Sequence, residues 1–238
     1  MNLRAWIFVI AGLSMAFTAH AASEKVNLPS VTATAEATIT AEPDEAQIDI
    51  GVVTQARTAP DAAKENADKV SRVIAAVKNL LGKGDEVKTA SYSLNPVYRY
   101  PQGGKPEITG YTASNTVRIK TGTLANVGKL IDASMDNGAN NINRLVFSLK
   151  DEHAVQLQAL RQAAAKAKAK AETMAQALGL VIVKVLAVNE GERSYRPISM
   201  PVARSARAEA MVAAPTPVEA GTIEVKSTVT FTGEIGPK

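Results

Sequence analysis

The chain has 238 residues, a formal net charge of +4 and no cysteine. Nucleic-acid binding calls for a concentrated basic stripe, so this mild charge predicts no nucleic-acid partner. Without cysteine the chain has no disulfides, no thiolate metal sites and no cysteine nucleophile. Its stability must come from an ordinary apolar core, which a chain of this length can bury.

Residues 1–21 are typical of a signal peptide. Arg4 gives a positive start, residues 5–19 form an uncharged and largely apolar run, and Ala19-His20-Ala21 offers a small-x-small cleavage pattern. The alternative is a retained transmembrane anchor, but the run is shorter than the roughly 20 residues that a spanning helix needs. We expect cleavage after Ala21. The mature chain, residues 22–238, is then periplasmic, free or associated with the outer membrane, without a transmembrane helix.

Seven segments have the pattern of β-strands. Most alternate apolar with polar residues, as a strand with one buried face does, and turn-forming residues separate them. The segment at 180–188 is strongly apolar, and the loop at 101–104 (Pro-Gln-Gly-Gly) joins two strands into a hairpin. The predicted strands are residues 31–40, 46–53, 86–100, 110–120, 142–150, 180–188 and 223–231.

Three segments predict helices, at residues 58–82, 124–138 and 151–179. Thr58 and Asp151 are suitable N-caps, and a glycine ends each segment. Residues of the same helical face recur every three or four positions. The stripe predicted to be buried is Ala63, Ala67, Val70, Ile74, Val77 and Leu81 in the first helix. In the third it is Leu157, Leu160, Ala164, Ala167, Ala171, Met174 and Leu178.

The order strand–helix–strand–strand occurs twice, in halves of about 45–120 and 142–232 that the short helix at 124–138 joins. This order predicts an α+β fold of antiparallel sheets with helices packed on one face. Residues 190–221 are rich in proline, alanine and arginine without a sustained period. They are too long for an ordinary connection, so we expect a long irregular arm.

Six short motifs appear in the order found in one known family, and together they span the chain from about Val31 to the C-terminus. On these residues the chain resembles the bacterial SIMPL-domain family, long catalogued as a domain of unknown function. The motifs are Pro43-Asp44-Glu45-Ala46, Gly51-Val52-Val53, Leu94-Asn95-Pro96-Val97-Tyr98, Gly110-Tyr111-Thr112-Ala113-Ser114-Asn115, Gly138-Ala139-Asn140-Asn141-Ile142 and Pro217-Val218-Glu219-Ala220-Gly221.

The resemblance implies a periplasmic or envelope-associated α+β protein that tends to self-assemble. Some relatives are linked to defence against oxidative stress, and some are known as surface antigens. The resemblance carries over no catalytic residues, because the family has no established active site.

His153 is the single histidine of the expected mature chain, beside Asp151 and Glu152 at a predicted helix start. A catalytic base would need an oriented nucleophile, and no G-x-S-x-G elbow is present. A metal ion would need further ligands, and two immediate neighbours have poor geometry for one ion. Acidic residues also suit a helix N-terminus electrostatically. We therefore expect an exposed helix-start histidine and no metal site.

Two other segments resemble binding sites only superficially. Residues 122–129 look like a phosphate loop, but five residues separate the glycines instead of four, and Leu130 stands where Ser or Thr belongs. The lysine run of Lys166, Lys168 and Lys170 fits a solvated helix face, with Lys168 and Glu172 spaced as an i,i+4 pair. An anionic-ligand site is the less favoured alternative for the run.

Four tyrosines fall on the predicted hairpin: Tyr92, Tyr98, Tyr100 and Tyr111. Tyrosine is enriched at protein interfaces because a rigid apolar ring carries a polar tip. A subunit interface and plain sheet packing are equally compatible with this placement, and ligand binding is a weaker third alternative.

These observations predict a non-enzymatic periplasmic or envelope protein that forms a homo-oligomer and contributes to envelope or oxidative-stress tolerance. No catalytic, cofactor-binding or metal-binding residue is identified, and no cofactor is expected. Met200 and Met211 are too few to argue for sacrificial oxidant scavenging. The alternative is a periplasmic binding module that captures a small ligand or an envelope protein partner through the arm at 190–221.

Overall fold

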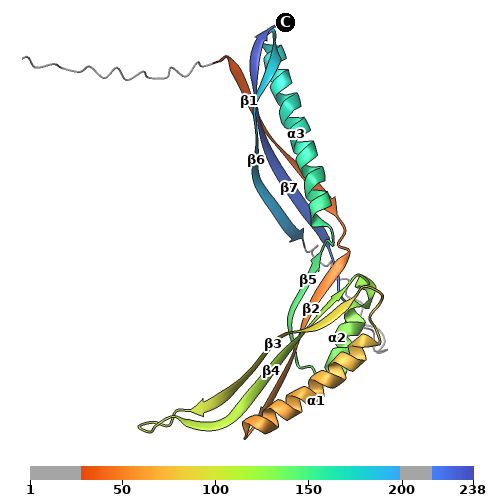
Figure 1. The fold of residues 1–238 in the computed structure, drawn as a ribbon, viewed down its shortest axis with the longest axis vertical. Helices are drawn as coiled ribbons and strands as arrows, with labels where there is room; N and C mark the ends of the chain where they lie inside the picture. Colours follow the sequence, from red (N-terminus) through yellow and green to blue (C-terminus); the bar gives the residue numbers. More distant parts are fainter. Residues whose placement is uncertain (1–27, 199–215) are drawn as a thin grey trace, which may run out of the picture.

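The computed structural model describes residues 28–198 and 216–238. Over this part the chain forms seven strands and three α-helices, and the strands make two separate antiparallel sheets. The two sheets follow one another along the long axis of the molecule (Figure 1). The predicted α+β class with antiparallel sheets is confirmed.

The three-stranded sheet has the order β1–β7–β6. It consists of β1 (Ser30–Ala41), β6 (Leu180–Ile198) and β7 (Thr222–Pro237), and the long helix α3 (Glu152–Ala177) packs on one face. Small side chains from β1, β7 and α3 form the core between helix and sheet. Its buried members are Ala33, Ala37, Ala163, Ala167, Ala171, Val229 and Phe231.

The four-stranded sheet has the order β3–β4–β2–β5. Its strands are β2 (Glu45–Ala56), β3 (Glu86–Arg99), β4 (Glu107–Thr121) and β5 (Asn141–Ser148). The helices α1 (Ala59–Lys78) and α2 (Val127–Asp136) cover one face, and the short 3-10 helix η1 (Leu124–Asn126) leads into α2 (Figure 1). Valine, isoleucine and leucine dominate this core, so its layers pack larger side chains than the core under α3.

The predicted repeat of strand–helix–strand–strand is present in the element order, but the sheets do not coincide with the predicted halves. β5 begins the second half and pairs with β2 of the first, while β1 pairs with β7. β1 thus lies beside β7 as β2 lies beside β4. This placement of β1 and β5 agrees with side-chain size. β1 presents small alanines to α3, and β5 presents Leu145 and Phe147 to the core of the four-stranded sheet.

Helix α1 begins as predicted and ends earlier. The Thr58 hydroxyl accepts a hydrogen bond from the Asp61 backbone N–H, and α1 ends at Lys78, one turn before Gly82. Its buried face is Ala62, Asn66, Val70, Val73 and Val77, so Val70 and Val77 are buried as predicted and the other three positions are shifted by one residue. The shift depends on Asn66, whose side-chain amide donates to the backbone oxygens of Val52 and Ala113 beneath the helix.

Helix α3 is capped by Asp151 and followed by Gly179 at a φ of +75°, as predicted. Its fully buried residues are alanines alone: Ala159, Ala163, Ala167, Ala171 and Ala175. Ala167 and Ala171 were predicted, and Leu160, Ala164 and Met174 of the predicted stripe are partly buried against the same core. Leu178 is 71% exposed, and Leu157 is also exposed. A four-residue spacing of alanines lets the helix backbone lie close to the sheet, which a stripe of leucines would prevent.

The predicted irregular arm at 190–221 is wrong in its first part. β6 continues to Ile198, where it pairs with Thr222, so residues 190–198 are strand. Three register shifts along β6 disrupt its two-residue alternation, so the sequence at 190–198 lacks the alternating pattern of a strand. Met200 and Met211 lie outside the described residues.

The far end of the predicted arm is docked on the other sheet's helices. The backbone N–H and hydroxyl of Thr216 both donate to the Asp132 carboxylate of α2, and Val218 packs against the core of the four-stranded sheet. The segment that leads into β7 is therefore attached to α2 at Thr216.

Replacing the fully buried Ala167 by Leu should lower the free energy of unfolding by about 1–3 kcal/mol, because the added carbons push α3 away from the sheet. Ala165→Leu, on the exposed face of α3, is the matched control and should change it by less than about 0.5 kcal/mol. Urea unfolding followed by circular dichroism measures both. Equal losses for the two variants would contradict close packing of the alanine face.

Candidate functional site: the β3–β4 hairpin

The hairpin of β3 and β4 extends beyond the rest of its sheet. β2 ends at Ala56 opposite Tyr111, whereas β4 begins at Glu107 and pairs there with Arg99 of β3. Figure 1 shows this two-stranded end reaching away from α1 and α2. Gly103 at a φ of +74° makes the turn possible, and the Gly104 N–H donates to the Pro101 carbonyl. The predicted hairpin is therefore confirmed, with a free distal end.

Apolar side chains are exposed along this hairpin. Almost every residue of β3 is exposed, and the tip residue Tyr100 is 75% exposed. The rings of Tyr98 and Tyr100 lie 6.4 Å apart between centroids, tilted by 41°. Such a cluster matches the composition of protein interfaces better than that of a solvated surface. The large exposed apolar residues are Tyr92, Leu94, Val97, Tyr98, Tyr100 and Ile108.

Tyr111, the fourth predicted tyrosine, is half-buried at the base of the hairpin. It lines a surface hollow of about 260 Å³ together with Arg57, Val97 and Thr109, among others. Gly110 borders the hollow, where an added Cβ would lie 2.9 Å from the Ala56 carbonyl oxygen. Glycine at this position thus permits the backbone of β4 to lie close to the Ala56 carbonyl at the end of β2.

An ion pair that sequence reasoning missed lies on the sheet face opposite the helices. The Arg118 guanidinium donates from Nε and Nη2 to the two carboxylate oxygens of Asp49, each at 2.7 Å. The Arg118 hydrogen bond holds the pKa of Asp49 below its usual value. Alternation along β2 placed Asp49 on the polar face, but its partner depends on the register of β2 with β4.

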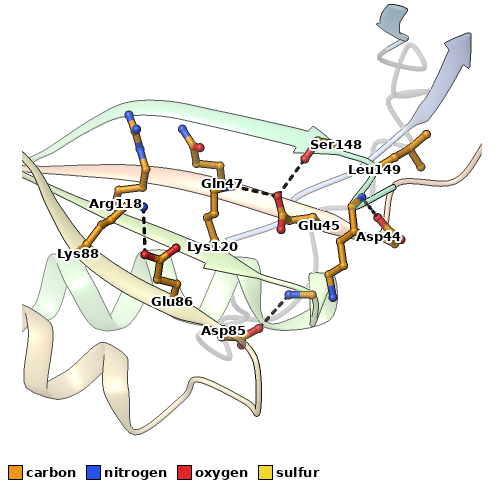
Figure 2. Close-up of polar contacts among 12 residues, drawn as sticks. Asp44, Glu45, Gln47, Asp85, Glu86, Lys88, Arg118, Lys120, Ser148 and Leu149 are labelled. Carbon is orange, nitrogen blue, oxygen red and sulfur yellow. Dashed lines mark hydrogen bonds and ion pairs between the residues drawn. The ribbon is translucent and has the colours of Figure 1, made fainter. Parts of the chain in front are cut away.

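Other carboxylates near this face bind backbone groups (Figure 2). Asp85 accepts hydrogen bonds from the backbone N–H groups of Gly82 and Gly122 and from the Thr121 hydroxyl. Burial alone raises the pKa of Asp85, but these hydrogen bonds and the nearby Lys150 charge lower it below its usual value. Such fully engaged carboxylates hold loops together and are not arranged as a general acid and base.

The segment at 122–129 is not a phosphate loop. The Gly122 N–H is used by Asp85, and the following residues enter η1 and α2, as their apolar periodicity predicted. This result agrees with the sequence interpretation.

His153 is exposed in the first turn of α3 and borders a hollow of about 30 Å³, formed with residues that include Glu190 and Arg193. Within residues 28–198 and 216–238, no group of three or more acidic, histidine or cysteine residues is placed to hold a metal ion. In the same part of the chain, no helix is long and apolar enough to cross a membrane.

The lysine run on α3 has two roles. Lys168 forms the predicted i,i+4 ion pair with Glu172 at 3.7 Å. Lys166 and Lys170 instead reach β1, where their ammonium groups donate to the backbone oxygens of Glu36 and Thr34. Sequence periodicity alone could not show the second role, because β1 lies far from α3 in the sequence.

The asparagine-rich motif before β5 is structural. The Asn140 side chain pairs with the backbone of Val53, accepting from its N–H at 2.9 Å and donating to its oxygen at 2.7 Å. Gly51 lies under the next residues, where an added Cβ would be 3.0 Å from the Asn141 Cβ. The motif residues thus fix the junction of β2 and β5.

Asp49→Asn should lower the free energy of unfolding at pH 7 by about 2 kcal/mol, between the values for exposed and buried pairs, because Arg118 loses its counter-ion. Since folding lowers the pKa of Asp49, the wild-type advantage is complete above the unfolded pKa of about 3.9. It is lost as the pH falls through the folded value. Urea unfolding at pH 7 and at about pH 3 measures the difference, and an advantage that grew in acid would contradict the assignment.

Comparison with known proteins gives a consistent family assignment. A model of the SIMPL family, described as a protein of unknown function (DUF541), matches residues 31–232. The chain is 32% identical over 237 residues to the 26 kDa periplasmic immunogenic protein of Brucella melitensis biotype 1, with 93% of this chain and 94% of the relative covered. It is 26% identical over 205 residues to the uncharacterized protein YggE of Escherichia coli K12, covering 86% and 82%. The chain belongs to the SIMPL family.

Proposed function

We propose that the chain is a non-enzymatic periplasmic protein that forms a homo-oligomer and contributes to envelope or oxidative-stress tolerance. The observation that carries the proposal is the free end of the β3–β4 hairpin, with its exposed apolar residues and its Tyr98–Tyr100 cluster. The signal-peptide pattern of residues 1–21 and the printed name of the Brucella relative support the periplasmic location.

A subunit contact through the hairpin is physically reasonable because two strands alone bury little apolar surface. An isolated two-stranded hairpin is marginally stable in water, and packing against another element is the usual remedy. A second subunit would cover the exposed tyrosines and aliphatic residues of the hairpin. Each aromatic ring contributes a large contact area at a small cost in side-chain entropy.

A second candidate function is a binding module for a small ligand or an envelope protein partner. The arm at 190–221 is a less suitable site than its sequence indicated, because its beginning belongs to β6 and its end is docked on α2. The hollow at the hairpin base favours this candidate instead, since it places the Arg57 side chain beside apolar walls. A reproducible rise in melting temperature with one periplasmic metabolite, lost in Arg57→Ala, would favour it over assembly.

Export of the chain is tested by the mass of the periplasmic protein. We expect a mature chain that starts at Ala22, or within a few residues of it, because Ala19-His20-Ala21 fits the specificity of signal peptidase. Mass spectrometry of the periplasmic fraction measures the N-terminus. Recovery of the intact chain with Met1 from membranes would show a retained anchor instead.

The double substitution Tyr98→Ser and Tyr100→Ser should shift the oligomer toward smaller species and reduce survival in hydrogen peroxide in a deletion strain that expresses it. The reason is the loss of two exposed rings from the proposed contact. Light scattering at micromolar concentrations measures the mass, and colony counts measure survival. A monomeric wild-type protein would refute assembly, and a folded double variant of unchanged mass would place the contact elsewhere.

Two matched variants control this experiment. Met135→Ser removes an exposed apolar side chain from α2, away from the hairpin, and should leave the oligomer mass unchanged. His153→Ala should leave mass and survival unchanged, because His153 serves no catalytic role in the proposal. A folded His153→Ala protein that failed to protect the strain would argue for a chemical activity.

A further inference from the structure

The hollow at the base of the β3–β4 hairpin lies where β2 ends. β2 pairs with β4 as far as Ala56, opposite Tyr111, and the part of β4 from Glu107 to Gly110 has β3 alone as its neighbour. The end of β2, the adjoining part of β4 and Val97 of β3 surround a space of about 260 Å³. The hollow is therefore a consequence of the fold, because one strand stops while its neighbours continue.

A β-bulge contributes to the hollow. Val97 of β3 lies opposite Gly110 of β4, whereas the next residue, Tyr98, lies opposite Ile108, so Thr109 is an extra residue of β4. The Thr109 hydroxyl donates to the Val97 carbonyl oxygen at 3.2 Å, and both residues line the hollow. Bulges are frequent beside functional sites, where they redirect a side chain. The bulge at Thr109 is thus a second feature, besides the strand end, that distinguishes this part of the hairpin.

Arg57 gives the hollow a positive charge. It directly follows β2, it is exposed, and none of the residues that line the hollow with it is acidic. The ion pairs found within residues 28–198 and 216–238 all use other side chains. A guanidinium presents its N–H donors in a planar fork that matches the two oxygens of a carboxylate. The hollow therefore offers one arginine to an anion.

The size and the other walls of the hollow narrow the class of anion. Pockets for drug-sized ligands usually measure about 300–1,000 Å³, so this smaller hollow suits a smaller molecule. Ala56, Val97 and Tyr111 line it, and contact with such residues favours a ligand with an apolar body. One arginine balances one negative charge, so a monoanion fits better than a doubly charged phosphate.

We propose that the hollow binds a small organic monocarboxylate with an apolar body. The Arg57 guanidinium pairs with the carboxylate, and the apolar body contacts Val97 and Tyr111. The inference rests on the second candidate function, the binding module, and names the chemical class of its ligand. Because Arg57 is exposed and the ligand is small, we expect weak binding, with a Kd on the order of 1 mM.

A carboxylate and its uncharged amide test the proposal directly. Phenylacetate and phenylacetamide share one apolar body and differ in the group that they offer to Arg57. We expect the mature protein to bind the acid about fivefold more tightly than the amide, as measured by saturation-transfer NMR. In Arg57→Gln the two affinities should become equal. Arg57→Lys keeps the charge without the planar fork and should retain part of the preference.

Two further variants locate the binding. Arg72→Gln is the matched control, because Arg72 is an exposed arginine of α1 that does not line the hollow, and it should leave the preference for the acid unchanged. Val97→Ser removes an apolar contact and should weaken both probes about threefold without changing the preference. Circular dichroism verifies the folding of each variant. Equal binding of acid and amide by the wild-type protein, or a full preference in folded Arg57→Gln, would overturn the proposal.

The failure of this inference can be distinguished from failure of either proposed function. The preference for the acid does not depend on the oligomer mass, so a monomeric wild-type protein refutes assembly and leaves the carboxylate site standing. Equal binding of phenylacetate and phenylacetamide refutes the carboxylate site. If an uncharged metabolite then raised the melting temperature of the wild-type protein but not of Arg57→Ala, the binding module would stand with another class of ligand.

Discussion

Twelve consecutive residue pairs join β1 to β7 without a register shift, from Ser30 opposite Glu234 to Ala41 opposite Ile223. This ladder connects the first described strand to the last and determines how the other elements are placed. With β1 beside β7, Ala33 and Ala37 face α3, and the helix packs over these two strands. β6 is then the outer strand, and β5 joins β2 in the other sheet. The entropy cost of such a distant closure grows only slowly with loop length, so the ladder's pairs can offset it.

Local signals were sufficient to predict most elements, and non-local contacts explain most of the errors. Thr58 and Asp151 cap helices in the structure because capping depends on neighbouring residues. The buried faces of α1 and α3 are only partly as predicted: Val70, Val77, Ala167 and Ala171 are buried, but so are the polar Asn66 and the further alanines Ala159, Ala163 and Ala175. The hairpin tyrosines were identified from sequence, but Tyr98 and Tyr100 lie beyond the end of β2, which only the register shows.

Polar groups in this fold mainly hold strands and loops in register. The Asn140 amide makes two hydrogen bonds with the backbone of Val53, as a neighbouring strand would. Asp85 accepts hydrogen bonds from two backbone N–H groups, and Asp49 of β2 forms an ion pair with Arg118 of β4. Each of these three side chains therefore has hydrogen-bond partners within the chain, whereas the buried side-chain oxygens of Asn66 and Asn115 have none among the described residues. Among the residues of the family motifs, Asn140 has an architectural role, because it fixes the junction of β2 and β5.

The exposed apolar residues have a different distribution, because they gather on the distal hairpin and on the β6 edge, in different sheets. A chain with one two-fold contact stops at a dimer, whereas two different contacts on separate parts of the chain can link dimers into a larger closed ring. Open polymerisation through the three-stranded sheet would need two available edges. Lys166 and Lys170 bind two backbone carbonyls of β1, those of Glu36 and Thr34, and make this edge less available for pairing. The positive charge on α3 therefore disfavours the addition of another strand at the β1 edge.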